Sequence, residues 1–178
     1  PVQMLLDVRL KNLASTRVSG IDLNFRYPVS THLGQLDFTL NANYLTRFDE
    51  AFLSTQAPFN VLNTIARPVD LRMRGSGTWS RNGFSMSAFL NYSNSYTDTI
   101  SVPNRHIGSW TTADLQLRYD ASTAGRTNLL EGVVLALSAL NLLDEDPPFV
   151  DSTRGVGYDA TNASPLGRYI ALSLSRRW

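Results

Sequence analysis

Residues 36–44 read LDFTLNANY, with an apolar residue at every second position and a polar residue between. A period of two predicts a β-strand that has one apolar face and one polar face. The same alternation returns in six more stretches: residues 18–27, 69–79, 84–92, 113–119, 133–139 and 170–178. Most of these stretches, with their flanks, approach the roughly 9–12 residues that a tilted strand needs to cross a bilayer. The sequence therefore predicts an all-β chain of antiparallel strands.

The links between these strands alternate strictly between short and long. The short links are residues 28–34, 80–83 and 121–132, and the long links are residues 46–67, 93–108 and 143–167. The second short link contains Asn82-Gly83, a pair that favours tight hairpins. Outer-membrane β-barrels have short periplasmic turns and long extracellular loops. The alternation therefore favours an up-and-down transmembrane barrel over a soluble β-sandwich.

Aromatic residues fall near the predicted strand ends. Tyr27, Trp79, Phe84 and Tyr119 lie beside short links, whereas Tyr44 and Tyr92 lie beside long loops. Aromatic rings prefer the membrane–water boundary, so these six residues are a candidate pair of aromatic girdles. The competing interpretation is ordinary packing, because strands are rich in aromatic residues in any environment. Trp110 and Tyr169 break the alternation of their own strands, which predicts a bulge or an inward-facing ring at each.

Composition narrows the function classes. The formal net charge is +1, which gives no electrostatic reason to expect a nucleic-acid partner. The chain has no cysteine, which excludes disulfides, thiolate metal sites and cysteine nucleophiles. The most apolar segment, residues 129–143, is interrupted by polar residues and is too short for a spanning helix. A membrane location would therefore require strands.

The strand count leaves two architectures open. We expect residues 18–178 to form seven strands and residues 1–17 to be an outer loop or a partial strand. A closed bacterial barrel normally has an even number of strands. Either Gln3–Leu10 is an eighth strand that closes a self-contained barrel, acting as an adhesin or structural protein, or the chain is part of a larger wall.

Several motifs, most of them near the end of the sequence, resemble a known family. Residues 138–149 (SALNLLDEDPPF) look like the penultimate strand and following loop of TonB-dependent outer-membrane receptors. Residues 157–160 (GYDA), residues 165–169 (PLGRY) and a last strand that closes on an aromatic residue are similar to the same family, as is the strand start RVSGID at residues 17–22.

The resemblance implies a wall of about 22 strands that encloses an amino-terminal plug domain. Such a receptor binds a scarce nutrient, for example a siderophore or an oligosaccharide, and imports it with energy from the TonB complex. The plug and the TonB box are missing from this sequence, so we expect it to be the carboxy-terminal part of the barrel. The implied location is the bacterial outer membrane. The implied partners are outer-membrane lipid, the plug and remaining barrel of the same receptor, the outer-membrane assembly machinery and, only through the missing part, TonB.

The resemblance also gives a role to the last strand. Apolar residues at alternate positions before a terminal aromatic residue resemble the signal that the outer-membrane assembly machinery recognises. Here these residues are Ile170, Leu172, Leu174 and Trp178, with Arg176 as a departure where an apolar residue is usual.

The sequence gives little support for a catalytic function. His32 and His106 are the only histidines, neither belongs to a recognised motif, and we expect both to be solvated. The acidic residues 144–146 and Asp151 lack the ligand spacing of an EF-hand, so no metal or cofactor is predicted. On the polar face, eight charged residues would line the interior of a barrel: Asp22, Arg26, Asp37, Asp70, Arg72, Arg74, Asp114 and Arg118.

Overall fold

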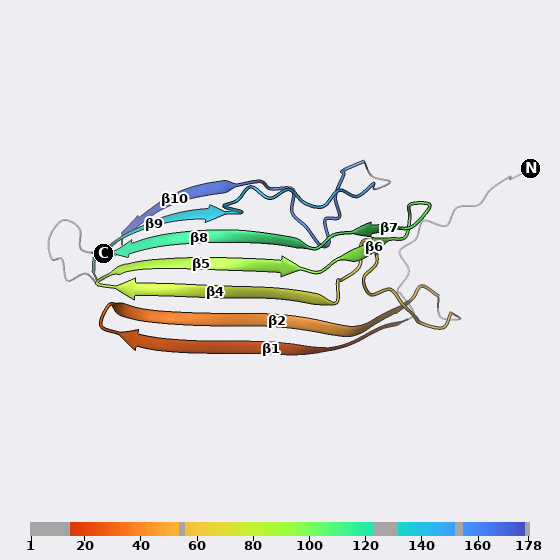
Figure 1. The fold of residues 1–178 in the computed structure, drawn as a ribbon, viewed down its shortest axis with the longest axis horizontal. Helices are drawn as coiled ribbons and strands as arrows, with labels where there is room; N and C mark the ends of the chain where they lie inside the picture. Colours follow the sequence, from red (N-terminus) through yellow and green to blue (C-terminus); the bar gives the residue numbers. More distant parts are fainter. Residues whose placement is uncertain (1–14, 54–55, 123–131, 152–154, 177–178) are drawn as a thin grey trace, which may run out of the picture.

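The computed structural model describes residues 15–53, 56–122, 132–151 and 155–176, and these residues form one large antiparallel sheet (Figure 1). Its seven long strands are β1 (Ser15–Thr31), β2 (Gly34–Ala51), β4 (Leu71–Arg81), β5 (Phe84–Ser93), β8 (Trp110–Asp120), β9 (Val133–Leu140) and β10 (Tyr169–Arg176). The short strand β3 (Phe59–Asn60) pairs with β2, and β6 (Tyr96–Asp98) and β7 (Arg105–Ile107) form a separate hairpin. The prediction of an all-β antiparallel fold is confirmed.

The long strands follow one another in the sheet in chain order, β1-β2-β4-β5-β8-β9-β10. Each neighbouring pair is antiparallel, so the topology is up-and-down. The β1–β2 and β4–β5 turns lie at one end of the sheet, and the loops that follow β2, β5 and β9 lie at the other end (Figure 1). A β-sandwich would require two sheets packed face to face, whereas the long strands that the structure describes share one sheet.

The pairing register sorts the side chains onto two faces. Asp22 pairs with Asn43 and Asn43 with Arg72, so these residues share the polar face. Phe25 pairs with Leu40 on the other side of the sheet, which we call the apolar face. No second layer covers the apolar face in the described residues: Leu23, Leu90 and Leu172 are 51%, 61% and 71% exposed.

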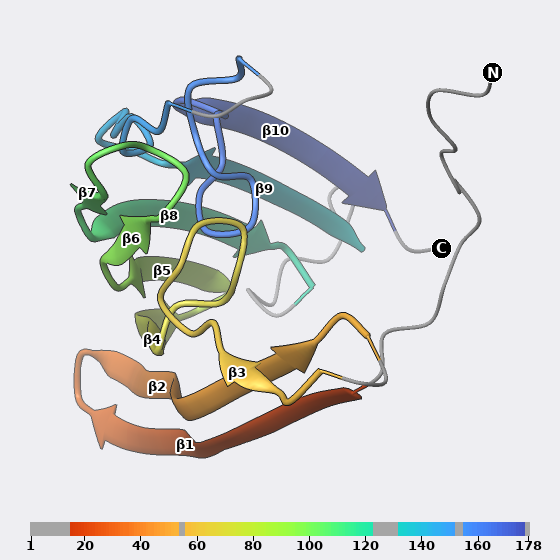
Figure 2. The same ribbon diagram turned by 90° about the vertical axis from the view of Figure 1, so that its right-hand side faces the viewer.

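The polar face lies on the inner side of the curved sheet. Figure 2 shows the sheet as a curved layer, with parts of the long loops on its concave side. Arg72, on the polar face of β4, donates to the carbonyl of Thr161 in the β9–β10 loop, which places that loop on the polar side. The curved sheet therefore presents its apolar face outward, as a barrel wall does.

The buried apolar cluster of the described residues lies among the loops. Val69, Tyr96, Ile107 and Val150 are each 5% exposed or less, and Ile65 packs against them. These residues come from all three long loops and the β6–β7 hairpin. We call this assembly of loops the loop cap. The apolar side chains of the long strands do not join this cluster. For example, Leu23 and Leu172 lie on the two border strands of the described sheet and are exposed.

The β1–β2 hairpin is longer than the sequence predicted. Pairing runs from Thr31–Gly34 at the turn to Ser15–Ala51 at the far end. The alternation predicts that the first strand ends before Pro28, but β1 is a border strand of the described sheet, where a residue without an N–H is tolerated. Tyr27 lies four residues before the end of β1, and Tyr44 lies seven residues before the end of β2, where it pairs with Leu71, the first residue of β4.

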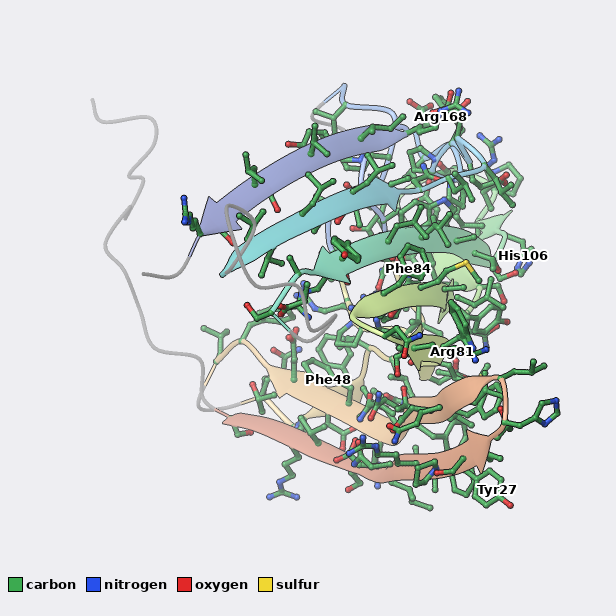
Figure 3. The ribbon with its side chains drawn as sticks, turned by 90° about the vertical axis from the view of Figure 1, so that its left-hand side faces the viewer. Tyr27, Phe48, Arg81, Phe84, His106 and Arg168 are labelled. Atoms are coloured by element: carbon green, nitrogen blue, oxygen red, sulfur yellow. The ribbon has the colours of Figure 1, made fainter. Side chains whose placement is uncertain are left out.

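A bulge changes the face that the far end of this hairpin presents. Ser19 pairs with Arg47 and Gly20 with Leu45, so Thr46 is the extra residue on β2. A bulge re-aims the side chains that follow it. Figure 3 shows Phe48, beyond the bulge, inside the curve of the sheet, whereas Tyr27 lies outside it.

One prediction concerns residues that the structure does not describe. The proposed eighth strand, Gln3–Leu10, lies outside the described residues, so closure by pairing with the last strand stays a prediction. Within the described residues, β1 and β10 each have one neighbour in the sheet.

No helix in the described part of the chain has the length and apolar character needed to span a membrane.

Candidate functional site

A hollow of about 480 Å³ opens on the polar face, between the middle of the sheet and the loop cap. Its polar lining comes from five strands and one loop: Asp22, Asn24, Asn41, Asn43, Arg72, Arg74, Asn91, Ser93, Trp110 and Asn162. Because side chains two apart on a strand share a face, the alternating pattern of β1, β2 and β4 brings these polar groups together. We refer to this space as the hollow.

Arg72 connects the wall of the hollow to the loop cap. Its Nη2 donates to the Thr161 carbonyl at 2.7 Å and to Asn162 Oδ1 at 2.6 Å. Both acceptors are neutral. Asn162 is buried, and its Nδ2 donates to the Arg67 carbonyl at 2.9 Å. The contact thus joins β4, the β9–β10 loop and the β2–β4 loop.

The buried Asp159 carboxylate is the junction of the loop cap. It accepts hydrogen bonds from the Ala66 amide, the Thr161 amide and Asn162 Nδ2, each at 2.9 Å. Burial raises the pKa of Tyr96, and the nearby Asp159 carboxylate, which the phenol also hydrogen-bonds, adds to the rise. Since these partners belong to three different loops, one carboxylate holds the loops together.

A second network, on β4, β5 and β8, includes Arg74 and Asn91 of the lining and extends beyond the hollow to Asp114. Asn91 Nδ2 donates to Asp114 Oδ2 at 3.0 Å, and Arg74 Nη1 lies 3.5 Å from the same oxygen. Arg74 also donates to Asn91 Oδ1 and stacks over the Phe89 ring, 4.4 Å from its centroid. The Asn141 amide donates to Asp114 Oδ1 at 3.0 Å, where β9 gives way to its loop. Arg74 is therefore already paired within the wall.

Two donors that line the hollow have no partner. Ser93 Oγ and Trp110 Nε1 are buried atoms without a hydrogen-bond partner in the described residues. They are neighbours, because Ser93 pairs with Trp110 across β5 and β8. This pairing puts the Trp110 ring on the polar face, as the broken alternation of its strand had allowed. Sequence reasoning did not bring Ser93 or Asn162 into a site, because the strand end and loop fold that place them are not local patterns.

The charged residues that we expected on the inner face do share it. By register, Asp22, Arg26, Asp37, Arg72, Arg74, Asp114 and Arg118 lie on the polar face, and Asp70 lies just before β4. Only three of them, Asp22, Arg72 and Arg74, line the hollow. Arg26 pairs with Asp37 (Nε–Oδ2 2.8 Å) and Arg118 with Asp120 (2.8 Å), towards the short-turn end of the sheet.

The six candidate girdle residues all lie on the apolar face by register, at different heights. Trp79, Phe84 and Tyr119 are within two residues of the short-turn ends of their strands, and Tyr92 is next to the last residue of β5. Trp79 packs against Phe84, with ring centroids 5.8 Å apart, and donates from Nε1 to the Leu33 carbonyl at 3.0 Å. Tyr27 and Tyr44 lie further from the strand ends, as described above.

The candidate assembly residues Ile170, Leu172 and Leu174 alternate on the apolar face of β10 and are 63%, 71% and 73% exposed. Trp178 lies outside the described residues. His32 and His106 are both exposed. Among the described residues no group of three or more His, Cys, Asp or Glu is placed to hold a metal ion.

A curved antiparallel sheet with an outward apolar face, an inward polar face and all its long loops at one end defines a section of an outer-membrane β-barrel. A comparison with protein-family models finds a match to the family "TonB dependent receptor-like, beta-barrel" over residues 4–142. This match covers most of the chain, and the chain belongs to that family. A comparison with curated proteins finds no matching sequence.

Membership of this family indicates the broad function of the chain, which is a receptor and transport role. TonB-dependent receptors are transport proteins of the bacterial outer membrane rather than enzymes. The match ends at residue 142, so it includes the motif strand up to Leu142 but not the later motifs that suggested the family from the sequence.

Proposed function

We propose that this chain forms barrel wall and extracellular loops of a TonB-dependent receptor that binds and imports a scarce nutrient such as a siderophore or an oligosaccharide. In the receptor, the apolar face meets outer-membrane lipid, and the polar face contacts the plug or the hydrated path beside it. The long loops with their loop cap face the medium, and the short turns face the periplasm.

One observation carries this proposal: the apolar face is continuous across all seven long strands and is exposed. At one height, for example, the register joins Phe25, Leu40, Gly75 and Leu90. Soluble monomers rarely expose an apolar surface of this extent. Lipid is the natural partner of such a face when the opposite face is polar and concave.

The same arrangement supports the finer assignments. Trp79, Phe84, Tyr119 and Tyr92 lie near strand ends on the apolar face, which suits rings at the two membrane boundaries. The outward alternation of Ile170, Leu172 and Leu174 suits an assembly signal that must be accessible on the last strand. TonB would act through a part of the receptor other than the residues described here.

A pair of arginine substitutions tests the proposal. Leu90→Arg places a charge on the apolar face near the middle of the sheet, whereas Gln116→Arg places it on the polar face at a position that is also exposed. If the apolar face meets lipid, Leu90→Arg lowers the free energy of unfolding by about 2–4 kcal/mol and Gln116→Arg changes it little. Urea unfolding of the protein in phospholipid bilayers measures both values.

Two results would contradict the proposal. Equal effects of the two substitutions would show that neither face is selectively in contact with lipid. A stable, monodisperse monomer in buffer without detergent or lipid would show that the apolar face is covered by protein.

A further inference from the structure

The hollow has unfilled hydrogen-bonding capacity, and most of it consists of donors. Both hydrogen bonds of Arg72 come from Nη2, so its Nε and Nη1 groups make no hydrogen bond to the described residues. Trp110 Nε1 can only donate, and its N–H is buried without a partner among the residues that the structure describes. Ser93, which is 9% exposed, adds an unpartnered hydroxyl. Buried polar groups are normally paired, so Ser93 and Trp110 mark a place for acceptor atoms from outside the described residues. Arg72, which pairs with Ser93 across β4 and β5, is exposed, so its free edge is open to the same acceptor.

Charge is distributed unevenly among the residues that line the hollow. Arg74 is paired with Asp114 and Asn91, whereas Arg72 has no carboxylate partner in the described part of the chain. Asp22 also lines the hollow, but it accepts from Asn43 Nδ2 at 2.6 Å and makes no ion pair with Arg72. Arg72 is therefore the one cation of the lining that can pair with an anion from outside without losing a carboxylate partner.

Part of the remaining lining suits hydroxyl groups, although Leu23, Ala42, Met73 and Tyr92 also belong to it. Asn24 and Asn41 are paired across β1 and β2 and are exposed on the polar face; Asn41 pairs with Arg74, so both amides lie one step along the face from Arg72. An amide offers both donors and acceptors, which matches a hydroxyl that does the same. The guanidinium of Arg72 matches a carboxylate, because charge-assisted hydrogen bonds between these groups are stronger than neutral ones.

We propose that the hollow is a binding site for a hydroxyl-rich carboxylate, with Arg72 as its charged contact and Ser93 and Trp110 as neutral donors. This inference rests on the proposed function, because the hollow lies on a ligand path only if the polar face encloses the interior of a barrel. A ligand carboxylate would take up the free edge of the guanidinium, and its hydroxyls would meet the amides of Asn24 and Asn41.

The probe is gluconate, and the matched neutral compound is gluconamide, which has the same hydroxylated chain with the carboxylate replaced by an amide. A ligand-observed NMR titration of the protein purified from outer membranes in LDAO micelles gives the Kd of each. We expect gluconate to bind about tenfold or more tightly than gluconamide, and Arg72→Gln to abolish this preference.

Two further variants separate the contact from its surroundings. Arg118→Gln removes an arginine from the same face outside the hollow, and it should leave the preference for gluconate intact. Arg26→Gln removes a second arginine of the polar face that is also outside the hollow, and it should likewise retain the preference.

Several outcomes would overturn the inference: no binding of gluconate, equal binding of gluconamide, an unchanged Kd in Arg72→Gln, or the same loss of preference in Arg118→Gln or Arg26→Gln as in Arg72→Gln. These results are distinguishable from a failure of the proposed function. A protein that tolerates Gln116→Arg but not Leu90→Arg in bilayers, yet shows no preference for gluconate, retains its place in the barrel wall and loses only this site.

Discussion

Single residues decide where this sheet changes direction. Gly20 lies at the bulge of the β1–β2 hairpin, and a Cβ there would lie 2.6 Å from the Tyr44 carbonyl oxygen. That separation is shorter than real Cβ contacts, and the obstacle is backbone rather than a flexible side chain. At Gly75, in contrast, a Cβ would meet only the Thr39 carbonyl oxygen at 3.9 Å. The two glycines therefore have different roles although both lie in strands.

This difference gives the first prediction at the residue scale. Gly20→Ala should destabilise the folded protein by about 1–3 kcal/mol, because the bulge must open to admit the methyl group. Gly75→Ala, the control, should be neutral or slightly stabilising, because alanine restricts the unfolded chain more than glycine does. Urea unfolding in micelles compares the two, and equal values would show that the bulge does not require glycine.

Residue-level patterns predicted the two faces but not the site. The alternation of β1, β2 and β4 correctly put Asp22, Arg72 and Arg74 on one face, because a period of two is a local property. The broken alternation at Trp110 signalled an inward ring. Asn162 could not be found in this way, because it reaches the hollow through a loop whose path depends on Asp159 and on contacts with distant residues.

At the scale of elements, the β6–β7 hairpin depends on a local carboxylate. Asp98 is fully buried; its Oδ2 accepts from Ser101 Oγ at 2.6 Å and its Oδ1 from the Ile100 amide at 2.9 Å. The hydrogen bond from the Ser101 hydroxyl, together with those from the Ile100 and Ser101 backbone amides, holds the pKa of Asp98 below its usual range. The carboxylate is thus the form that the folded hairpin stabilises.

The lowered pKa predicts an acid-sensitive hairpin. A depressed pKa contributes stability above the unfolded value of about 4 and loses it as the pH falls through the folded value. The hydrogen-exchange protection factors of the Ile100 and Ser101 amides should therefore fall in acid. Asp98→Asn should lower them at neutral pH and remove their pH dependence, whereas Asp146→Asn, at an exposed position, should change neither.

Strand boundaries were predicted less well than strand existence, for physical reasons. Phe84–Ser93 begins at a turn marked by Asn82 and Gly83, which both have positive φ angles of 48° and 79°, so a local signal fixed its start. Pro28 led to a wrong prediction of where the first strand ends, because the free-energy cost of a missing N–H depends on whether the strand has a neighbour on both sides. That information belongs to the sheet and not to the segment.

At the scale of the whole molecule, the structure separates two tryptophans by environment. Trp79 lies on the apolar face near the short-turn end, and Trp110 lies on the polar face beside the hollow. If the apolar face meets lipid, only Trp79 is within reach of lipid tails. The distinction concerns the orientation of the entire wall rather than any one strand.

Fluorescence quenching by brominated lipid tests this orientation. In bilayers, a variant that retains only Trp79 should be quenched strongly, and one that retains only Trp110 should be quenched little; the other tryptophans are replaced by phenylalanine in each case. Strong quenching of Trp110 would place the polar face against lipid and would contradict the orientation of the wall. Weak quenching of both would indicate that protein covers the apolar face.

The junction at Asp159 limits how the loop cap can diversify. Because its partners include Ala66, Tyr96 and Asn162, a sequence change in one loop must preserve the contacts that the other two need. If the chain belongs to a nutrient receptor as proposed, evolution toward a new ligand would therefore alter the exposed loop tips, such as residues 99–104, or exchange all three loops together. Loop grafting between relatives faces the same constraint. A single transplanted loop would lack the residues of the other two loops that complete the hydrogen bonds of the junction.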